Sequence, residues 1–383
     1  MRIGTVTYHR SHNYGAFLQA YALVSFLREE VGVDAEIIDY NMKISKNNYI
    51  YQIFRPNVFK SLGGLKRYRM FNREVKKLPV SKGTLVSDSI EEFTGFVKDK
   101  YDIIITGSDE VWRIGNRGFP NPYWLSEDLG CKKIAYAVSS RSKFDKIDDE
   151  KKLLLKKLVS DFDYVGVRDT ATYEMVLENI SDEKKLHKNC DPVFLYDFKQ
   201  NAEKGKRLLK EKFRIDTKKP TVGLMIGQKE LGVNLAKNLK KLYKDKYNFV
   251  SLYFDHAGLP FCPGLTPFEW ADVVAGLDFF VTTYFHGTCF AIKSNVPFFT
   301  VECRNGEGNT GKSYDLLGEM GLLDCYSTKG DSSLNEKITA AIEEKIGQKM
   351  DYELLCRKQK EKAESFVAVI LREKEQTENE RCN

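Results

Sequence analysis

The stretch from 277 to 294 constrains the fold of this chain more than any other. An apolar run, Leu277 to Val281, ends in the small polar turn Thr282–Gly287, and the segment TCFAIKSN that follows is typical of a helix. Such a strand, turn and helix unit belongs to an open α/β sheet, which binds ligands at the carboxyl edge of its strands. The pattern predicts that His286 is displayed at that edge.

An imidazole beside a helix N-terminus suits proton transfer on an anionic substrate. The free N–H groups and the dipole of the predicted helix attract anions, and histidine titrates near neutral pH. We therefore predict that His286 is a catalytic acid–base residue and that Gly287 and Thr288 help to bind an anion. The alternative is that His286 only caps the helix.

The length of 383 residues exceeds one ordinary hydrophobic core and predicts two domains. No apolar run approaches the roughly 20 residues that span a bilayer, and the N-terminus lacks the apolar core of a signal peptide. The 8 cysteines form no CxxC and the 5 histidines have no metal-site spacing. We expect a cytoplasmic protein without a metal, and a net charge of +6 gives no reason to expect nucleic acid.

Strand patterns alternate with helix patterns along most of the chain, which predicts parallel α/β sheets. We place an N-terminal domain at 1–200, a charged linker at 201–219, a second α/β domain at 220–330 and a charged helical tail at 331–383. The expected fold is two Rossmann-like domains that face a cleft. The ligand would then lie between the carboxyl edges of both sheets.

Residues 41–83 are unusually basic, with eleven Lys and Arg side chains and a single acid, Glu74. Aromatic and aliphatic residues are interleaved among them. One interpretation is that this basic insert lies on an anionic membrane surface or grips an anionic acceptor. The alternative is a solvated helical excursion on the domain surface.

The turn between the first predicted strand and helix, YHRSHNYG, is a second candidate part of the site. A glycine there lets backbone N–H groups at the helix start approach a ligand. The alternative is a turn whose polar groups satisfy one another. Neither GxGxxG nor a P-loop pattern occurs, which disfavours dinucleotide binding. We assign acceptor binding to His9, Asn13, Tyr14, Gly15 and Gln19.

Two more predicted strands end in polar side chains. In TGSDEVW, Ser108 and Asp109 could bind sugar hydroxyls and Trp112 could stack on a sugar, although Asp109 could instead be a helix cap. In VRD, Arg168 suits a carboxylate or phosphate, and a salt bridge is the alternative. We interpret Asp191, in CDPVF, as a turn residue. Further candidate cations are Arg141, Arg304 and Lys312.

Six segments in this order resemble the polysaccharide pyruvyl transferase family: TYHRSHNYGAFLQAYAL, YDIIITGSDEVW, IAYAVSS, YVGVRD, CDPVFL and FVTTYFHGTCFAIKSNVPF. The resemblance runs from Met1 to about Leu323. It implies an architecture like that of GT-B glycosyltransferases, with the donor on the C-terminal domain and the acceptor on the N-terminal domain. It also implies transfer of a pyruvyl group from phosphoenolpyruvate to a free or lipid-linked saccharide, with no cofactor required.

The resemblance also implies residue roles. His286 corresponds to the family's catalytic histidine, and Arg168 to an anion ligand. Tyr284 stands where many members have arginine and some have serine. We assign it to donor binding, although its side chain lacks the positive charge of arginine. Arg141 or Arg304 could supply that charge.

Protons from the sugar hydroxyls could pass to Asp109 or His9. Two other functions fit the same architecture: a glycosyltransferase that uses a nucleotide sugar, and a saccharide-binding paralogue that has lost catalysis.

Overall fold

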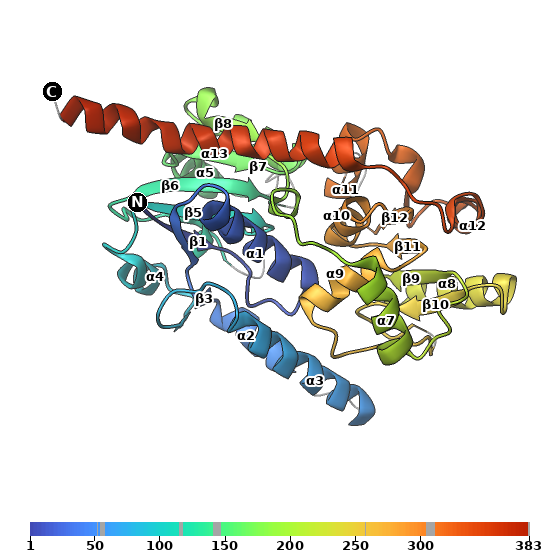
Figure 1. Ribbon diagram of the computed structural model, residues 1–383. Coiled ribbons are helices and arrows are strands. Elements are labelled where there is room, and N and C mark those ends of the chain that lie inside the picture. The colour runs from blue at the N-terminus through green and yellow to red at the C-terminus, as the bar shows by residue number, and fades with distance from the viewer. Residues whose placement is uncertain are drawn as a thin grey trace.

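The computed structural model describes residues 1–51, 53, 58–114, 118–140, 147–256, 258–303 and 311–381 of the chain. Its backbone forms two large parallel sheets, one in each half of the sequence (Figure 1), and a small sheet of two short strands. The first sheet has the order β2-β1-β5-β6-β7-β8 and the second has the order β10-β9-β11-β12-β13. The strands of the first are β1 (Arg2–Val6), β2 (Asp34–Ile37), β5 (Ile103–Asp109), β6 (Lys132–Val138), β7 (Tyr164–Val167) and β8 (Leu186–Lys188), and those of the second are β9 (Thr221–Met225), β10 (Asn248–Ser251), β11 (Phe279–Thr282), β12 (Phe298–Glu302) and β13 (Tyr326–Thr328).

Both faces of the first sheet are buried, which explains why its central strand reads as an unbroken apolar run. Because side chains alternate along a strand, Ile103 and Ile105 of β5 join one hydrophobic cluster and Ile104 joins another. The helices in the cluster of Ile103 and Ile105 include α1 (Tyr14–Glu29) and α13 (Glu353–Arg381). Those in the cluster of Ile104 are α4 (Ile90–Val97), α5 (Asp149–Ser160) and α6 (Thr170–Leu177).

The second sheet is covered in the same way. Val281 of β11 packs in a cluster of its own domain, whereas Phe280 packs in the cluster that also contains α1. The helices in the cluster of Val281 are α8 (Lys229–Tyr243) and α12 (Leu334–Lys345). Those in the cluster of Phe280 include α7 (Ala202–Phe213), α9 (Pro267–Ala275), α10 (Phe285–Lys293) and α11 (Lys312–Glu319). A capping box begins α9 as predicted, because Thr266 and Glu269 exchange hydrogen bonds.

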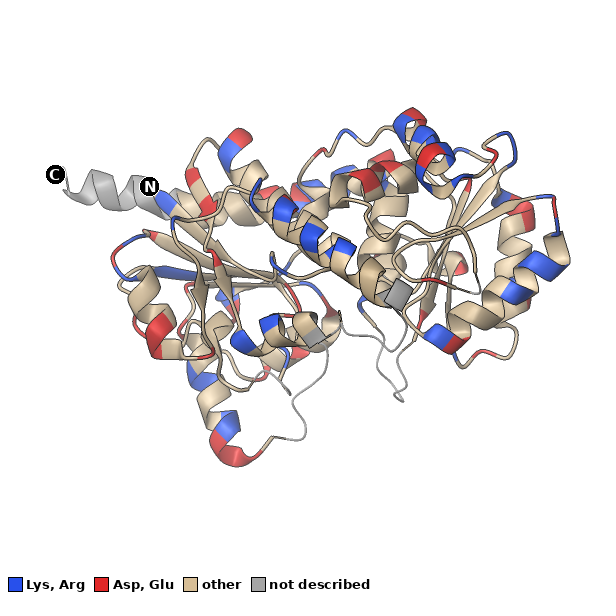
Figure 2. Ribbon diagram, turned by 90° about the horizontal axis from the view of Figure 1, so that it is seen from below, with Lys and Arg blue, Asp and Glu red and all other residues tan. Residues whose placement is uncertain are grey.

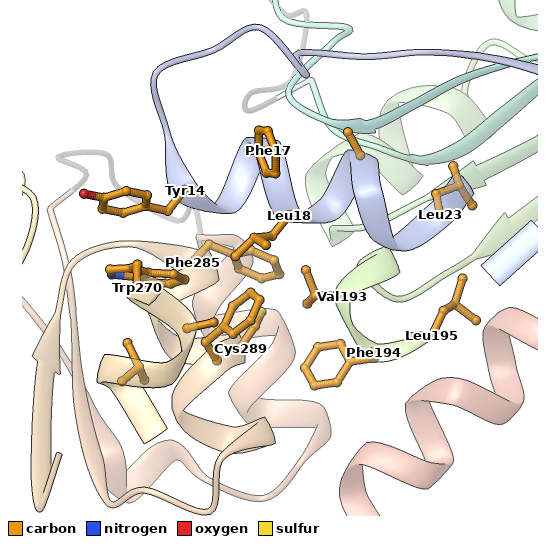
Figure 3. Packing of buried hydrophobic residues seen from close by; sticks show 14 of the residues in the cluster. Tyr14, Phe17, Leu18, Leu23, Val193, Phe194, Leu195, Trp270, Phe285 and Cys289 are labelled. Atoms are coloured by element: carbon orange, nitrogen blue, oxygen red, sulfur yellow. The ribbon is translucent and has the colours of Figure 1, made fainter. Parts of the chain in front are cut away.

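The two domains therefore share one hydrophobic core. Figure 3 shows α1 of the first domain lying over α9 and α10 of the second. The Tyr14 ring stacks on Trp270 with ring centroids 5.3 Å apart, and Phe17 meets Phe268 edge to face. Burial of these aromatic surfaces holds the carboxyl edges of the two sheets together.

The basic insert forms α2 (Lys43–Tyr51) and α3 (Val58–Val75), preceded by β3 (Tyr40–Asn41) and followed by β4 (Leu85–Val86). Met70 and Phe71 of α3 are buried in the shared core. The Arg67 guanidinium lies 4.4 Å from the centre of the Tyr253 ring and donates to the Tyr253 carbonyl. The insert thus bridges to the second domain. Within the described residues, no helix is both long and apolar enough to cross a membrane.

The segment 201–219 connects the two sheets in sequence, and most of it is the helix α7. At Gly205 a Cβ atom would overlap the Asp272 carbonyl oxygen of α9, so glycine allows these helices to pack closely. In the segment 331–383, α12 packs on the second sheet through Ile338 and Ile342. Its last helix, α13, runs back across the first domain beside β7 and β8 (Figure 1).

Phe366 attaches α13 to the first domain, where it contacts the rings of Tyr136, Tyr164 and His187. We predict that Phe366→Ala lowers the free energy of unfolding by about 3–5 kcal/mol, the usual cost of removing a buried phenylalanine. Urea denaturation measures this change. Leu354→Ala on the same helix is the control, because Leu354 is 60% exposed, and an equal loss in both variants would contradict the docking role of Phe366.

Candidate functional site

A buried cluster of charged side chains lies where the carboxyl edges of the two sheets meet. At its centre is Asp191, which follows β8 and begins the short helix η3 (Pro192–Phe194). Its Oδ2 atom is 2.5 Å from a guanidinium nitrogen of Arg168, at the end of β7, and 3.2 Å from Nε2 of His286. His286 belongs to the first turn of α10 in the second domain. A single carboxylate oxygen therefore contacts both domains.

A second carboxylate, Asp109 at the end of β5, extends the cluster. Its Oδ1 atom lies 3.3 Å from Arg168 and 4.0 Å from Nζ of Lys312, which begins α11. Lys312 also lies 3.1 Å from Glu110. The aromatic ring of Phe285 faces both cations, with Arg168 at 4.7 Å and Lys312 at 5.2 Å from its centroid. The cluster thus holds two cations between the two domains.

The first turn of α1 packs directly on His286. A Cβ atom at Gly15 would overlap the imidazole, so only glycine allows this contact. Asn13 caps α1, with its side-chain oxygen accepting hydrogen bonds from Gly15 N at 2.9 Å and Ala16 N at 3.2 Å. The ring of His286 consequently lies between the N-terminus of α1 and the carboxylate of Asp191.

Charge compensation decides the ionisation of both carboxylates. Burial alone would raise the pKa of Asp191, but His286 and Arg168 outweigh it, so the pKa falls well below its ordinary value. Burial likewise opposes ionisation of Asp109, whose pKa is nevertheless lowered by Lys312, Arg168 and His286. Both carboxylates are therefore ionised at neutral pH.

The backbone of Asp109 is in the left-handed region, with φ of +86°. For a residue with a Cβ atom, such a conformation costs about 1–3 kcal/mol and persists only where the surroundings impose it. Here the amide of Asp109 donates to Ser108 Oγ at 2.6 Å, and its carboxylate is held by Arg168. The strain is thus located at the cluster.

The cluster contains several of the residues predicted from the sequence: Asp109, Arg168, His286 and Lys312, with Gly15 in contact. Ser108 is also there, but it is fully buried, so its hydroxyl supports Arg168 rather than facing a sugar. Within the described part of the chain, no group of three or more His, Cys, Asp or Glu is arranged to hold a metal ion. The candidate cations Arg141 and Arg304 lie outside the described residues.

Four residues assigned to acceptor binding have side chains that point into the protein, so the structure gives these assignments no support. Trp112 is buried and stacks on Trp124 with ring centroids 4.7 Å apart. The buried ring of His9 lies 3.1 Å from Asp39, which gives this ring a structural partner. Gln19 and Tyr14 are also buried, the first bonded to Thr7 Oγ1 at 2.9 Å and the second stacked on Trp270.

In the second domain, two of the anion-binding assignments have a structural explanation instead. Thr288 is buried and its hydroxyl lies 2.7 Å from that of Thr300, which gives this side chain a partner within the domain. A Cβ atom at Gly287 would overlap Thr282 Oγ1, so the glycine lets α10 start directly after β11. Tyr284 is half-buried beside Tyr253, and its role stays a prediction.

The sequence interpretation missed the importance of Asp191. Its Oδ1 atom does accept from Val193 N at 3.1 Å, as a turn residue would. The other oxygen, however, joins Arg168 to His286. The signal that the sequence offered was the position of Asp191. It follows a strand of the same parallel sheet as the strands that lead to Asp109 and Arg168, and these strands end at the same edge.

The family model of polysaccharide pyruvyl transferase matches residues 13–305 of this chain. The chain belongs to the polysaccharide pyruvyl transferase family. This match confirms the resemblance seen in the six segments and makes the protein a member of a transferase family. None of the curated proteins matches the chain.

The fold of this pyruvyl transferase family member is similar to that of solved GT-B enzymes. The UDP-GlcNAc 2-epimerase from Methanocaldococcus jannaschii is 12% identical, with a TM-score of 0.55 over 97% of this chain and 99% of that chain. The Neisseria meningitidis UDP-GlcNAc 2-epimerase is 11% identical, with a TM-score of 0.55 over 97% and 100%. Anabaena Alr3699/HepE, solved with UDP and glucose, is 10% identical, with a TM-score of 0.56 over 97% and 99%. These likenesses confirm the predicted two-domain fold.

We predict that Asp191→Asn destabilises the protein by about 3–5 kcal/mol at pH 7, because it leaves a buried guanidinium without its main partner. The lowered pKa of Asp191 means that its stabilising contribution is complete above about pH 4, the ordinary carboxyl pKa, and is lost as pH falls further. The difference in unfolding free energy from wild type should therefore be constant from pH 8 to 5 and shrink below pH 4.

Urea denaturation at each pH measures this difference. Asp149→Asn, at a side chain on α5 that is 99% exposed, is the control. A difference for Asp191→Asn that stays constant down to pH 3 would contradict the assignment.

Proposed function

We propose that this chain transfers a pyruvyl group from phosphoenolpyruvate to a saccharide. Membership of the family supports the reaction class. The observation that carries the proposal is the contact of His286 with Asp191, at 3.2 Å, beside Arg168 and Lys312 at the junction of two domains. An acid–base group next to two cations fits a substrate that carries both a carboxylate and a phosphate.

In this reaction, a proton adds to the methylene carbon of phosphoenolpyruvate, and a sugar hydroxyl bonds to the neighbouring carbon, which has become oxocarbenium-like. A second hydroxyl then displaces phosphate and completes the ketal. One of the two hydroxyl protons returns to the acid that protonated the carbon, and the other leaves with the phosphate. We assign His286 to proton transfer, with Asp191 orienting the ring and stabilising its charge when it holds a proton.

The two cations differ in accessibility, which suggests different roles. The side chain of Arg168 is 2% exposed and pairs with two carboxylates. We assign it to positioning Asp191 and Asp109. The side chain of Lys312 is 14% exposed, and we assign it to contact with the donor's phosphate or carboxylate, as a mobile point charge does in other phosphate sites.

His286→Asn should lower turnover by roughly a hundredfold or more, the usual contribution of an acid–base group. Phosphate release from phosphoenolpyruvate in the presence of a saccharide acceptor measures it. His187→Asn is the control histidine, because His187 faces Phe366 of α13 instead of the cluster. Turnover of His286→Asn within a few-fold of wild type would refute the assignment.

The alternative of a nucleotide-sugar glycosyltransferase is supported by the fold, since Anabaena Alr3699/HepE was solved with UDP and glucose. Tyr284, without the charge found in many family members, is the residue that keeps this alternative open. A thermal-shift series with phosphoenolpyruvate, UDP and GDP separates the two functions. Stabilisation by UDP or GDP alone would favour the glycosyltransferase.

We also propose peripheral contact with an anionic membrane through α3, which would bring the enzyme to a lipid-linked acceptor. Figure 2 shows Lys and Arg along this helix. Lys66, Arg69 and Arg73 are exposed, and so is Leu62, at 57%. An apolar side chain among exposed cations suits the surface of an anionic bilayer.

Arg69→Glu combined with Arg73→Glu should weaken co-sedimentation with phosphatidylserine vesicles by roughly thirtyfold or more, at about 1 kcal/mol for each basic residue lost. Lys237→Glu with Lys241→Glu on α8 changes the net charge equally at exposed positions and serves as the control. An equal loss in both double variants would indicate an effect of net charge alone and reject the membrane face.

A further inference from the structure

A polar hollow of about 170 Å³ lies between the basic insert and the loop that follows β1. It is separate from the charged cluster, and the proposed function does not use it. Its wall consists of residues from that loop, from the end of β3, from α2 and α3, and from β4 and the residue before it. The residues that carry the argument are Arg10, His12, Asn41, Lys46, Tyr68 and Asn72.

The volume of the hollow fits one six-membered ring, since a protein cavity of about 150 Å³ holds benzene. An apolar ring is disfavoured because most of the lining groups are polar. Asn41 and Asn72 each offer an amide that can both donate and accept, and Tyr68 offers a ring face together with a hydroxyl. This combination is typical of sites that bind sugar hydroxyls.

The charges of the lining residues set a second requirement for the ligand, which is an anionic group. Arg10 and Lys46 are cations, and none of the described residues that line the hollow is an acid. The guanidinium of Arg10 is fixed by Asp39, at 2.5 Å and 2.6 Å, whereas Lys46 is exposed and makes no ion pair with the described residues. Burial and Arg67 lower the pKa of His12 to about 4, so its ring is a neutral hydrogen-bonding group at pH 7. We propose that the hollow binds one sugar residue of the acceptor that carries a carboxylate or a phosphate.

The position of the hollow relates it to the catalytic cluster, so the inference rests on the proposed function. His12 lines the hollow, and Gly15, three residues later, packs on His286. Three residues span at most about 11 Å. Tyr253 of the second domain donates to the His12 carbonyl at 2.5 Å, which fixes this loop between the two domains. The bound sugar is therefore near the sugar that receives the pyruvyl group. Because the lining of the hollow shares no residue with the charged cluster, we assign the two positions to different sugars of an oligosaccharide acceptor.

Ligand-observed NMR with the full chain tests the proposal, using glucuronic acid, glucose 6-phosphate, glucose and inorganic phosphate as separate probes. We expect at least one anionic sugar to bind tenfold or more tightly than glucose. Lys46→Ala should weaken that binding several-fold, and Asn72→Leu, which replaces a lining amide by a bulkier apolar side chain, should abolish it. Lys43→Ala on the same helix is the matched control, because Lys43 is exposed and does not line the hollow.

Inorganic phosphate that binds as tightly as glucose 6-phosphate would overturn the sugar assignment, and so would unchanged affinity in both Lys46→Ala and Asn72→Leu. A thermal-shift measurement confirms that each variant is folded. The same titration in His286→Asn separates this proposal from the proposed function. Unchanged sugar affinity in that variant is expected, whereas sugar binding by a wild-type protein that releases no phosphate from phosphoenolpyruvate would reject pyruvyl transfer and leave the hollow assigned.

Discussion

The contact of one carboxylate oxygen of Asp191 with both Arg168 and His286 links the site to the domain arrangement. A buried charge is costly unless it is paired. Arg168 supplies one partner from the same domain, and His286 supplies the other from the opposite domain. The geometry of the cluster consequently depends on the packing of α1 over α9 and α10, and a loss of that packing would separate the imidazole from its carboxylate.

The fold was largely predictable because its strongest signals are local. The isoleucine run of β5 and the apolar run that contains β11 are buried on both faces, so each is nearly continuous in the sequence. Contacts between distant segments gave no such signal. The charge of α7 suggested a linker, whereas its apolar face packs on α9. The basic side chains of α3 likewise concealed Met70 and Phe71, which belong to the shared core.

The site was only partly predictable, because a strand end specifies where a residue is and not where its side chain points. Arg168 and Asp109 lie at the sheet edge and face the second domain, where they contact Phe285 and Lys312 respectively. Trp112 is only three residues beyond Asp109, yet it turns inward onto Trp124. His9 similarly pairs with a buried acid, Asp39, of a neighbouring segment. These directions are set by tertiary packing, which no single segment of the sequence encodes.

The chain passes between the two domains twice, once before α7 and again before α13. Two connections restrict the relative motion of the domains more than a single connection would, because any rearrangement must keep both of them intact. Any separation of the domains that admits substrates would then swing His286 and Lys312 together, as one rigid unit, away from Asp191 and Asp109.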